Sequence, residues 1–98
     1  MRTEVKDLVA LGPLPAGEQV AAESLTRFEA ALRSIVPPIA QDEATELVML
    51  FGPDDCFGLA WTLLHLVETA PDLQPVVDRA DASNMWVHEI AERLNRAG

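Results

Sequence analysis

The sequence has few basic residues and a single cysteine, and these shortages exclude several classes of protein. Its 98 residues include 7 Lys and Arg against 16 Asp and Glu, for a formal net charge of −9. Binding to nucleic acid or to an anionic membrane surface depends on clustered Lys and Arg, so neither partner is expected. The lone Cys56 cannot form an intramolecular disulfide, and no apolar run approaches the ~20 residues that cross a bilayer. The charged first residues do not resemble a secretory signal, so we expect a cytoplasmic protein.

Motifs for catalysis, metal binding and cofactor binding are missing as well. The chain has no CxxC, HxxxH, HExxH or EF-hand spacing, no GxSxG, Walker A or GxGxxG sequence, and no tyrosine. Paired acids occur only where helices are expected to begin, and there the helix dipole explains them. We therefore expect a protein that is not an enzyme and that uses neither a metal nor a cofactor.

Apolar residues recur at helical spacing along most of the chain, between short stretches that contain proline and glycine. The clearest helix is predicted over 18–36, where one apolar stripe comprises Ala21, Leu25, Phe28, Leu32 and Ile35. No segment alternates convincingly with a period of two. Further helices are expected over 42–51, about 53–69 and 83–96, with 3–11 either a helix or a strand and 72–82 a turn plus a loop.

Capping residues and inner faces can be assigned to several of these helices. Thr3 and Ser83 are the expected N-caps of the first and last helices. The core side of 42–51 is formed by Leu47, Val48 and Phe51 and widened by Met49 and Leu50, and that of the last helix by Trp86, Val87, Ile90 and Leu94. The length suits one domain. We predict an all-α fold over 1–98, a single compact bundle of four to five short helices around a central hydrophobic helix at about 53–69.

The predicted helix over 53–69 has an apolar arc that covers roughly half its circumference. The opposite side carries a strip of Gly58, Thr62, His65 and Thr69, with Trp61 beside it. Two interpretations of this strip remain open. It is either a close contact with another helix, or an exposed recognition surface with Trp61 as its anchor and His65 and Glu68 as polar contacts.

Acidic residues are concentrated in the middle of the chain. Residues 34–78 contain no Lys or Arg and eight acids, namely Asp42, Glu43, Glu46, Asp54, Asp55, Glu68, Asp72 and Asp78. This segment therefore carries −8 of the net −9. The concentration serves either solubility and helix-dipole complementation, or an acidic face that steers a basic partner.

Residues 51–68, with the sequence FGPDDCFGLAWTLLHLVE, resemble the small helical immunity proteins that bacteria encode beside polymorphic toxins. The shared features are an acidic pair, a Gly-hydrophobic-Trp stretch and a helix that ends in His-hydrophobic-hydrophobic-Glu. The resemblance covers about a fifth of the chain. It implies a small acidic helical protein that binds a toxin and neutralises it by occlusion.

The leading hypothesis is thus a non-catalytic protein-binding module, an immunity or inhibitor protein that covers a basic toxin or enzyme with its acidic face. The expected partner-binding residues are Asp42, Glu43, Glu46, Asp54, Asp55, Trp61, His65 and Glu68. The alternative is a small structural or adaptor subunit that self-associates, for example as a homodimer. Its contact residues would be Met85, Trp86 and the stripe of the helix over 18–36.

Overall fold

Six α-helices account for most of the chain in the computed structural model, which describes residues 1–97. They are α1 (Thr3–Ala10), α2 (Ala22–Ser34), α3 (Gln41–Leu47), α4 (Leu59–Val67), α5 (Gln74–Arg79) and α6 (Met85–Ala97). Two short 3-10 helices, η1 (Gly17–Gln19) and η2 (Val48–Leu50), precede α2 and follow α3. No strand occurs within residues 1–97, so the all-α prediction is confirmed and the segment 3–11 is a helix.

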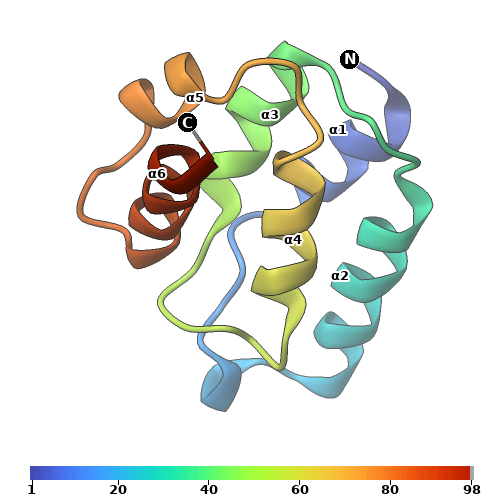
Figure 1. The fold of residues 1–98 in the computed structure, drawn as a ribbon. Helices are drawn as coiled ribbons and strands as arrows, with labels where there is room; N and C mark the ends of the chain where they lie inside the picture. Colours follow the sequence, from blue (N-terminus) through green and yellow to red (C-terminus); the bar gives the residue numbers. More distant parts are fainter. Residues whose placement is uncertain (98) are drawn as a thin grey trace.

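Helix α4 lies in the middle of the molecule, and α2, α3 and α6 pack around it (Figure 1). Six of its nine residues are buried: Leu59, Ala60, Leu63, Leu64, Leu66 and Val67. Helix α1 packs against α2 and α3. The prediction of a central hydrophobic helix is therefore confirmed. None of the helices within residues 1–97 is long and apolar enough to span a membrane.

The predicted start of this central helix at about residue 53 is wrong. Gly58 is its N-cap, with a φ of 87°, and the two residues before it also have positive φ, 46° for Cys56 and 56° for Phe57. A right-handed helix cannot pass through such residues, so they form a turn instead. Gly58 is therefore not a mid-helix residue, and Phe57, an apolar residue within the predicted helix over 53–69, is 70% exposed. Asp54 accepts hydrogen bonds from the N–H groups of Gly17 and Cys56 rather than capping α4.

Two predicted N-caps are also displaced by one residue. Helix α1 begins directly after Arg2, so Thr3 is its first helical residue, and no side chain caps it. Before α6 the capping side chain belongs to Asn84, whose Oδ1 accepts a hydrogen bond from the Trp86 N–H at 2.9 Å. Ser83 lies one position too early for this role. Serine and asparagine are both favoured N-cap residues, and the backbone geometry places Asn84 rather than the predicted Ser83 at the cap.

The apolar stripe predicted over 18–36 is confirmed where α2 forms. Phe28, Leu32 and Ile35 are buried and Leu25 packs partly against the core, but Ala21 is exposed. Helix α2 is shorter than predicted because Val20 and Ala21 have an extended backbone, which separates η1 from the start of α2 at Ala22. One further helix, α5, was not predicted: it lies within 72–82, where a turn plus a loop was expected.

The core side predicted for 42–51 is confirmed for Leu47, Val48 and Phe51, all of which are buried. Leu50 is buried as well, whereas Met49 is 59% exposed. From Val48 to Leu50 the chain tightens from an α-helix to a 3-10 helix. A turn of three residues rotates side chains differently from one of 3.6, so Met49 leaves the face that α-helical spacing assigned to it.

Candidate functional site

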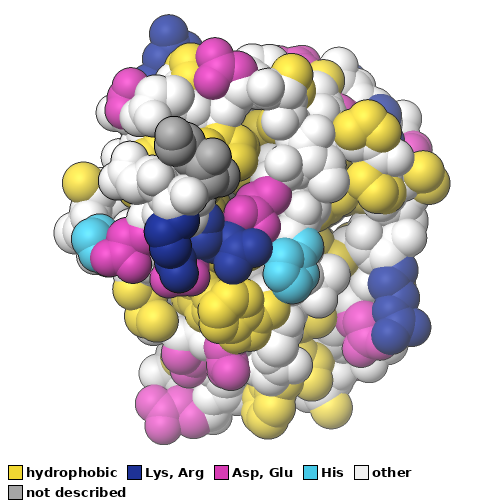
Figure 2. Space-filling model, viewed as in Figure 1, with side chains coloured by type: hydrophobic (Ala, Val, Ile, Leu, Met, Phe, Trp, Pro, Cys, Tyr) yellow, Lys and Arg dark blue, Asp and Glu magenta, His cyan; other side chains and the backbone are white. Residues whose placement is uncertain are grey.

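The outer face of α4 is open to solvent. Trp61, Thr62 and His65 are exposed, and Gly58 and Thr69 are half-buried. Where α4 and α6 meet, an apolar patch is visible, with basic and histidine side chains on one side and acidic side chains on the other (Figure 2). Of the two interpretations of the strip, close packing against another helix is therefore wrong, and an exposed surface is what the fold provides.

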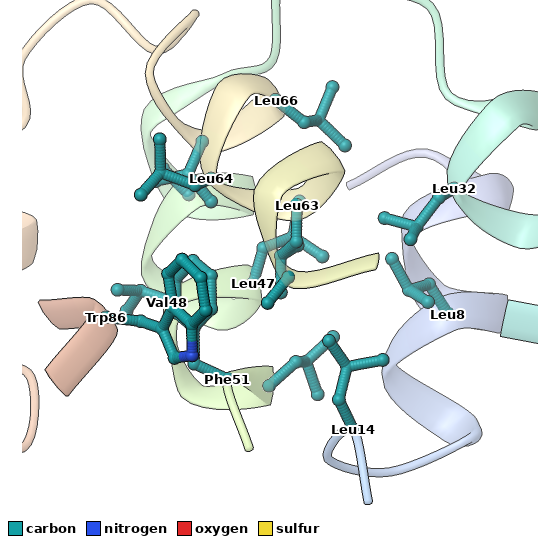
Figure 3. Packing of buried hydrophobic residues seen from close by; sticks show 14 of the residues in the cluster. Leu8, Leu14, Leu32, Leu47, Val48, Phe51, Leu63, Leu64, Leu66 and Trp86 are labelled. Carbon is teal, nitrogen blue, oxygen red and sulfur yellow. The ribbon is translucent and has the colours of Figure 1, made fainter. Parts of the chain in front are cut away.

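Trp61 is held in place by a row of aromatic rings that begins in the core. Its ring lies edge-on to that of Trp86, with 4.9 Å between centroids and 90° between planes. Trp86 is buried, stacks on Phe51 at 6.0 Å and donates its Nε1–H to the Asp54 carbonyl at 3.1 Å (Figure 3). On the solvent side, the His65 ring is 6.5 Å from Trp61. Aromatic pairs of this kind contribute about 0.5–1.5 kcal/mol beyond burial, so the contact with Trp86 favours the observed orientation of the 42% exposed Trp61 ring.

Glu68 does not present a free negative charge on this face. Its Oε2 lies 2.6 Å from Nε of Arg93 and its Oε1 accepts from Nη2 at 3.0 Å. The hydrogen bond and charge of Glu68 raise the pKa of the Arg93 guanidinium above its already high value. Arg93 comes from α6, outside the acidic middle of the chain, and the sequence analysis did not associate it with the site.

Glu43, predicted as a partner contact, is only 2% exposed and is part of the core. Its Oε2 accepts from Nε of Arg2 at 3.0 Å and its Oε1 from Nη2 at 3.1 Å. Oε1 also accepts from the Ala40 N–H at 2.8 Å, which helps to begin α3. Its carboxylate therefore anchors the N-terminal segment to α3 and is not available on the surface.

The remaining predicted acids are divided between two ends of the molecule. Asp42 and Glu46 belong to α3, and Asp54 and Asp55 to the loop before α4; the start of α3 and this loop lie at opposite ends of α4 (Figure 1). Asp54 is used by the backbone bonds described above. The Asp55 side chain is exposed and makes no hydrogen bond or ion pair within residues 1–97. The acids therefore do not form one continuous face.

Cys56 belongs to the same loop, and its thiol is fully buried in the core. Burial raises the pKa of the Cys56 thiol, and the charges of Asp54 and Asp55 raise it further. A thiol in this setting stays protonated and is a poor nucleophile. In the part of the chain that the structure describes, no three His, Cys, Asp or Glu side chains are grouped so as to hold a metal ion.

The surface proposed for self-association is mostly internal. Trp86 is 3% exposed and Phe28, Leu32 and Ile35 are buried, which leaves Met85 at 58%, the exposed Ala21 and the half-buried Leu25. Met85 borders an open pocket of about 510 Å³ together with Pro13, Leu14, Phe51, Gly52, Pro53, Asp81, Ser83 and Asn84. The polar side chains of this pocket bond one another or the backbone, Asp81 through Ser83 and Asn84 through the Phe51 carbonyl.

Comparison with known protein families, with curated proteins and with solved structures found no match to this chain. The fold brings Trp61 and His65 together, pairs Glu68 with Arg93, and buries Glu43 with Arg2. Sequence reasoning missed the exposure of Phe57, for which the only signal was a glycine in the next position.

Proposed function

We propose that this protein is a non-catalytic inhibitor of the immunity type, which binds a toxin or enzyme through the exposed face of α4 and occludes its working surface. The observation that carries the proposal is Trp61. A single exposed apolar residue needs no explanation, but this one is 42% exposed while its ring is fixed edge-on against the buried Trp86. A rigid tryptophan loses little conformational freedom on binding, and tryptophans are favoured centres of protein interfaces.

The residues around Trp61 suit the rim of such an interface. Thr62 and His65 are exposed hydrogen-bonding groups on the same face, and the Glu68–Arg93 pair supplies both charge signs. Polar rims around an aromatic centre are the usual composition of protein–protein contacts. The resemblance of residues 51–68 to immunity proteins supports the same proposal, because Trp61 and His65 both belong to that segment.

The net charge of −9 favours a positively charged partner. A negative protein attracts a basic one over long range, which raises the association rate and makes it fall with salt. Asp55, Asp42 and Glu46 remain for this role, since Glu43 and Asp54 are used inside the fold. Charge reversal at the first three tests steering, whereas reversal at Glu43 or Asp54 tests folding.

The test is capture of the partner with tagged protein from cells that express it, followed by titration of the purified partner. Trp61→Ala is expected to raise the dissociation constant at least ~30-fold, as for an interface hot spot of about 2 kcal/mol. Val36→Ala is the matched control, because Val36 is 70% exposed on the connection between α2 and α3. A partner that binds Trp61→Ala as tightly as wild type, or that stays active in the complex, contradicts the proposal.

A further inference from the structure

The turn before α4 has the opposite hand to the helix that follows it. Cys56, Phe57 and Gly58 are three consecutive residues with positive φ. The Leu59 N–H bonds the Cys56 carbonyl and the Ala60 N–H bonds the Asp55 carbonyl, both at 3.1 Å, so the turn is closed by its own hydrogen bonds. Positive φ is natural for glycine and rare for phenylalanine, and residues held this way concentrate at functional sites.

The result of this geometry is that two neighbouring side chains point in opposite directions. Cys56 enters the core with no exposed surface, whereas Phe57 is 70% exposed. The positive φ at Phe57 is unfavourable for a phenylalanine, and burial of its largely exposed ring offsets little of that cost. The ring lies beside Gly17, since a Cβ built on that glycine would be 3.5 Å from the Phe57 Cε2. Stability does not account for a phenylalanine here.

A groove of about 240 Å³ lies beside the ring, between α2 and the first turn of α4. Its lining residues are Glu29, Leu32, Arg33, Phe57, Gly58, Leu59 and Thr62. Leu32 and Leu59 are buried and supply apolar walls, and nothing lies within 4 Å of a Cβ built on Gly58. Thr62 belongs to both this groove and the Trp61 face, so the two surfaces are continuous.

The charges around Phe57 are predominantly negative. Asp54 and Asp55 lie three and two residues before it, and their charges raise the pKa of the intervening Cys56 thiol, which burial has already raised. Glu29 is compensated by Arg33 at 2.9 Å, but Asp55 has no such partner within residues 1–97. A second copy of this chain would bring the same negative charges, which disfavours it as the occupant.

From this combination we infer that Phe57 and the adjoining groove form a second anchor point, which receives an apolar side chain flanked by Lys or Arg on the partner protein. This inference rests on the proposed function of the α4 face and extends that face across the turn to α2. Phe57 and Trp61 then act as two fixed aromatic contacts on either side of Thr62, and Asp55 pairs with the basic residues of the bound segment.

The location of the contact is tested by photo-crosslinking the full chain in extracts of the native cells, in which the salt concentration can be set. p-Benzoylphenylalanine replaces Phe57 in one variant and Trp61 in another, and mass spectrometry identifies the attached peptide. Both positions are expected to capture the same protein, with Lys or Arg beside the residue joined to position 57 and a yield that falls with added salt. Capture at 61 without capture at 57 overturns this inference and leaves the proposed function standing. Capture at neither position overturns both, and capture of a second copy at 57 overturns the assigned occupant.

A second variant separates binding from folding. Phe57→Asn is expected to melt at or above the wild-type temperature, because asparagine tolerates positive φ and little buried surface is lost. With the partner identified by cross-linking, the same variant is expected to bind at least tenfold more weakly, while Val36→Asn binds as wild type. Unchanged affinity overturns the inference. A clearly lower melting temperature also overturns it, since Phe57 would then serve the fold.

Discussion

Replacing Arg2 with methionine removes the cation that compensates the buried Glu43 carboxylate. The Arg2 side chain bonds both carboxylate oxygens, and its Nη1 and Nη2 also donate to the carbonyls of Val36 and Pro38 at 2.7 and 3.1 Å. Methionine keeps the unbranched apolar stem and loses every one of these donors. The N-terminal segment, the α2–α3 connection and the start of α3 are joined through this one side chain, so the substitution loosens all three.

The expected cost is about 2 to 3 kcal/mol of unfolding free energy, intermediate between breaking a buried pair and an exposed one. The estimate lies nearer the buried limit because the Glu43 side chain is 3% exposed, while that of Arg2 is 30% exposed. For a domain of this size the loss corresponds to a melting temperature lower by roughly 10 to 20 °C. Thermal unfolding followed by circular dichroism at neutral pH measures it. Lys6→Met is the matched control, since Lys6 is an exposed cation on α1.

The pH dependence gives the same experiment a second readout. Burial by itself raises the pKa of Glu43, but the hydrogen bonds from Ala40 and Arg2, with the Arg2 charge, outweigh it and hold that pKa below its usual value. A carboxyl with a lowered folded pKa stabilises the fold above its unfolded pKa, and this contribution is lost as pH falls through the folded value. The difference between wild type and Arg2→Met therefore shrinks as pH falls through the range in which Glu43 becomes protonated, because a neutral carboxyl does not require the Arg2 cation. A difference that is the same at neutral and acidic pH, or a variant that melts within about 3 °C of wild type, refutes the reasoning.

Three further substitutions or treatments test other parts of the structure. Gly52→Ala is expected to destabilise the protein by more than ~2 kcal/mol in denaturant titration, because its Cβ would lie 1.9 Å from the Leu14 carbonyl oxygen; a stable variant contradicts this packing. Asn84→Ala is expected to cost about 1 to 2 kcal/mol in the same titration by removing the cap on the Trp86 N–H and the bond to the Phe51 carbonyl; Thr3→Ala is the control, because the exposed Thr3 hydroxyl makes no hydrogen bond within residues 1–97. The Cys56 thiol is expected to resist alkylation in the native protein at pH 8 and to react fully in denaturant, because it is buried and its pKa is raised; rapid native labelling would show that the turn opens.

Helical periodicity predicted the fold class and much of the core, because a buried stripe is a property of the local sequence. Phe28 and Leu32 of α2 and Ile90 of α6 were assigned correctly on spacing alone. The start of α4 was not, since apolar spacing continues without interruption through Cys56 and Phe57. The hand of the backbone there depends on three φ angles and on hydrogen bonds to residues on either side. A glycine at 58 was the only local signal, and it fits a mid-helix position as well as a left-handed N-cap.

The candidate site was less predictable than the fold, because the sequence does not show which charges meet. Arg2 and Arg93 lie outside the acidic stretch 34–78, yet the fold carries them to Glu43 and Glu68 within it. Counting charge along the chain therefore overstated the acidity of the α4 face. Trp61 was recognised because a tryptophan opposite a broad apolar arc is visible on a helical wheel whatever the tertiary contacts are.

Because Glu43 and Glu68 are paired with arginines, charge reversal at the remaining acids is what distinguishes a general acidic surface from a defined interface. If negative charge alone attracts the partner, reversal of Asp55, Asp42 and Glu46 has similar effects at each position, since long-range steering depends little on place. If the aromatic face is the interface, Asp55 stands beside Phe57 and lies at the opposite end of α4 from Asp42. Reversal at Asp55 then slows association and also speeds dissociation, whereas reversal at Asp42 changes association alone. The rates of these two single variants therefore separate steering from contact, which equilibrium binding of a multiply reversed variant cannot do.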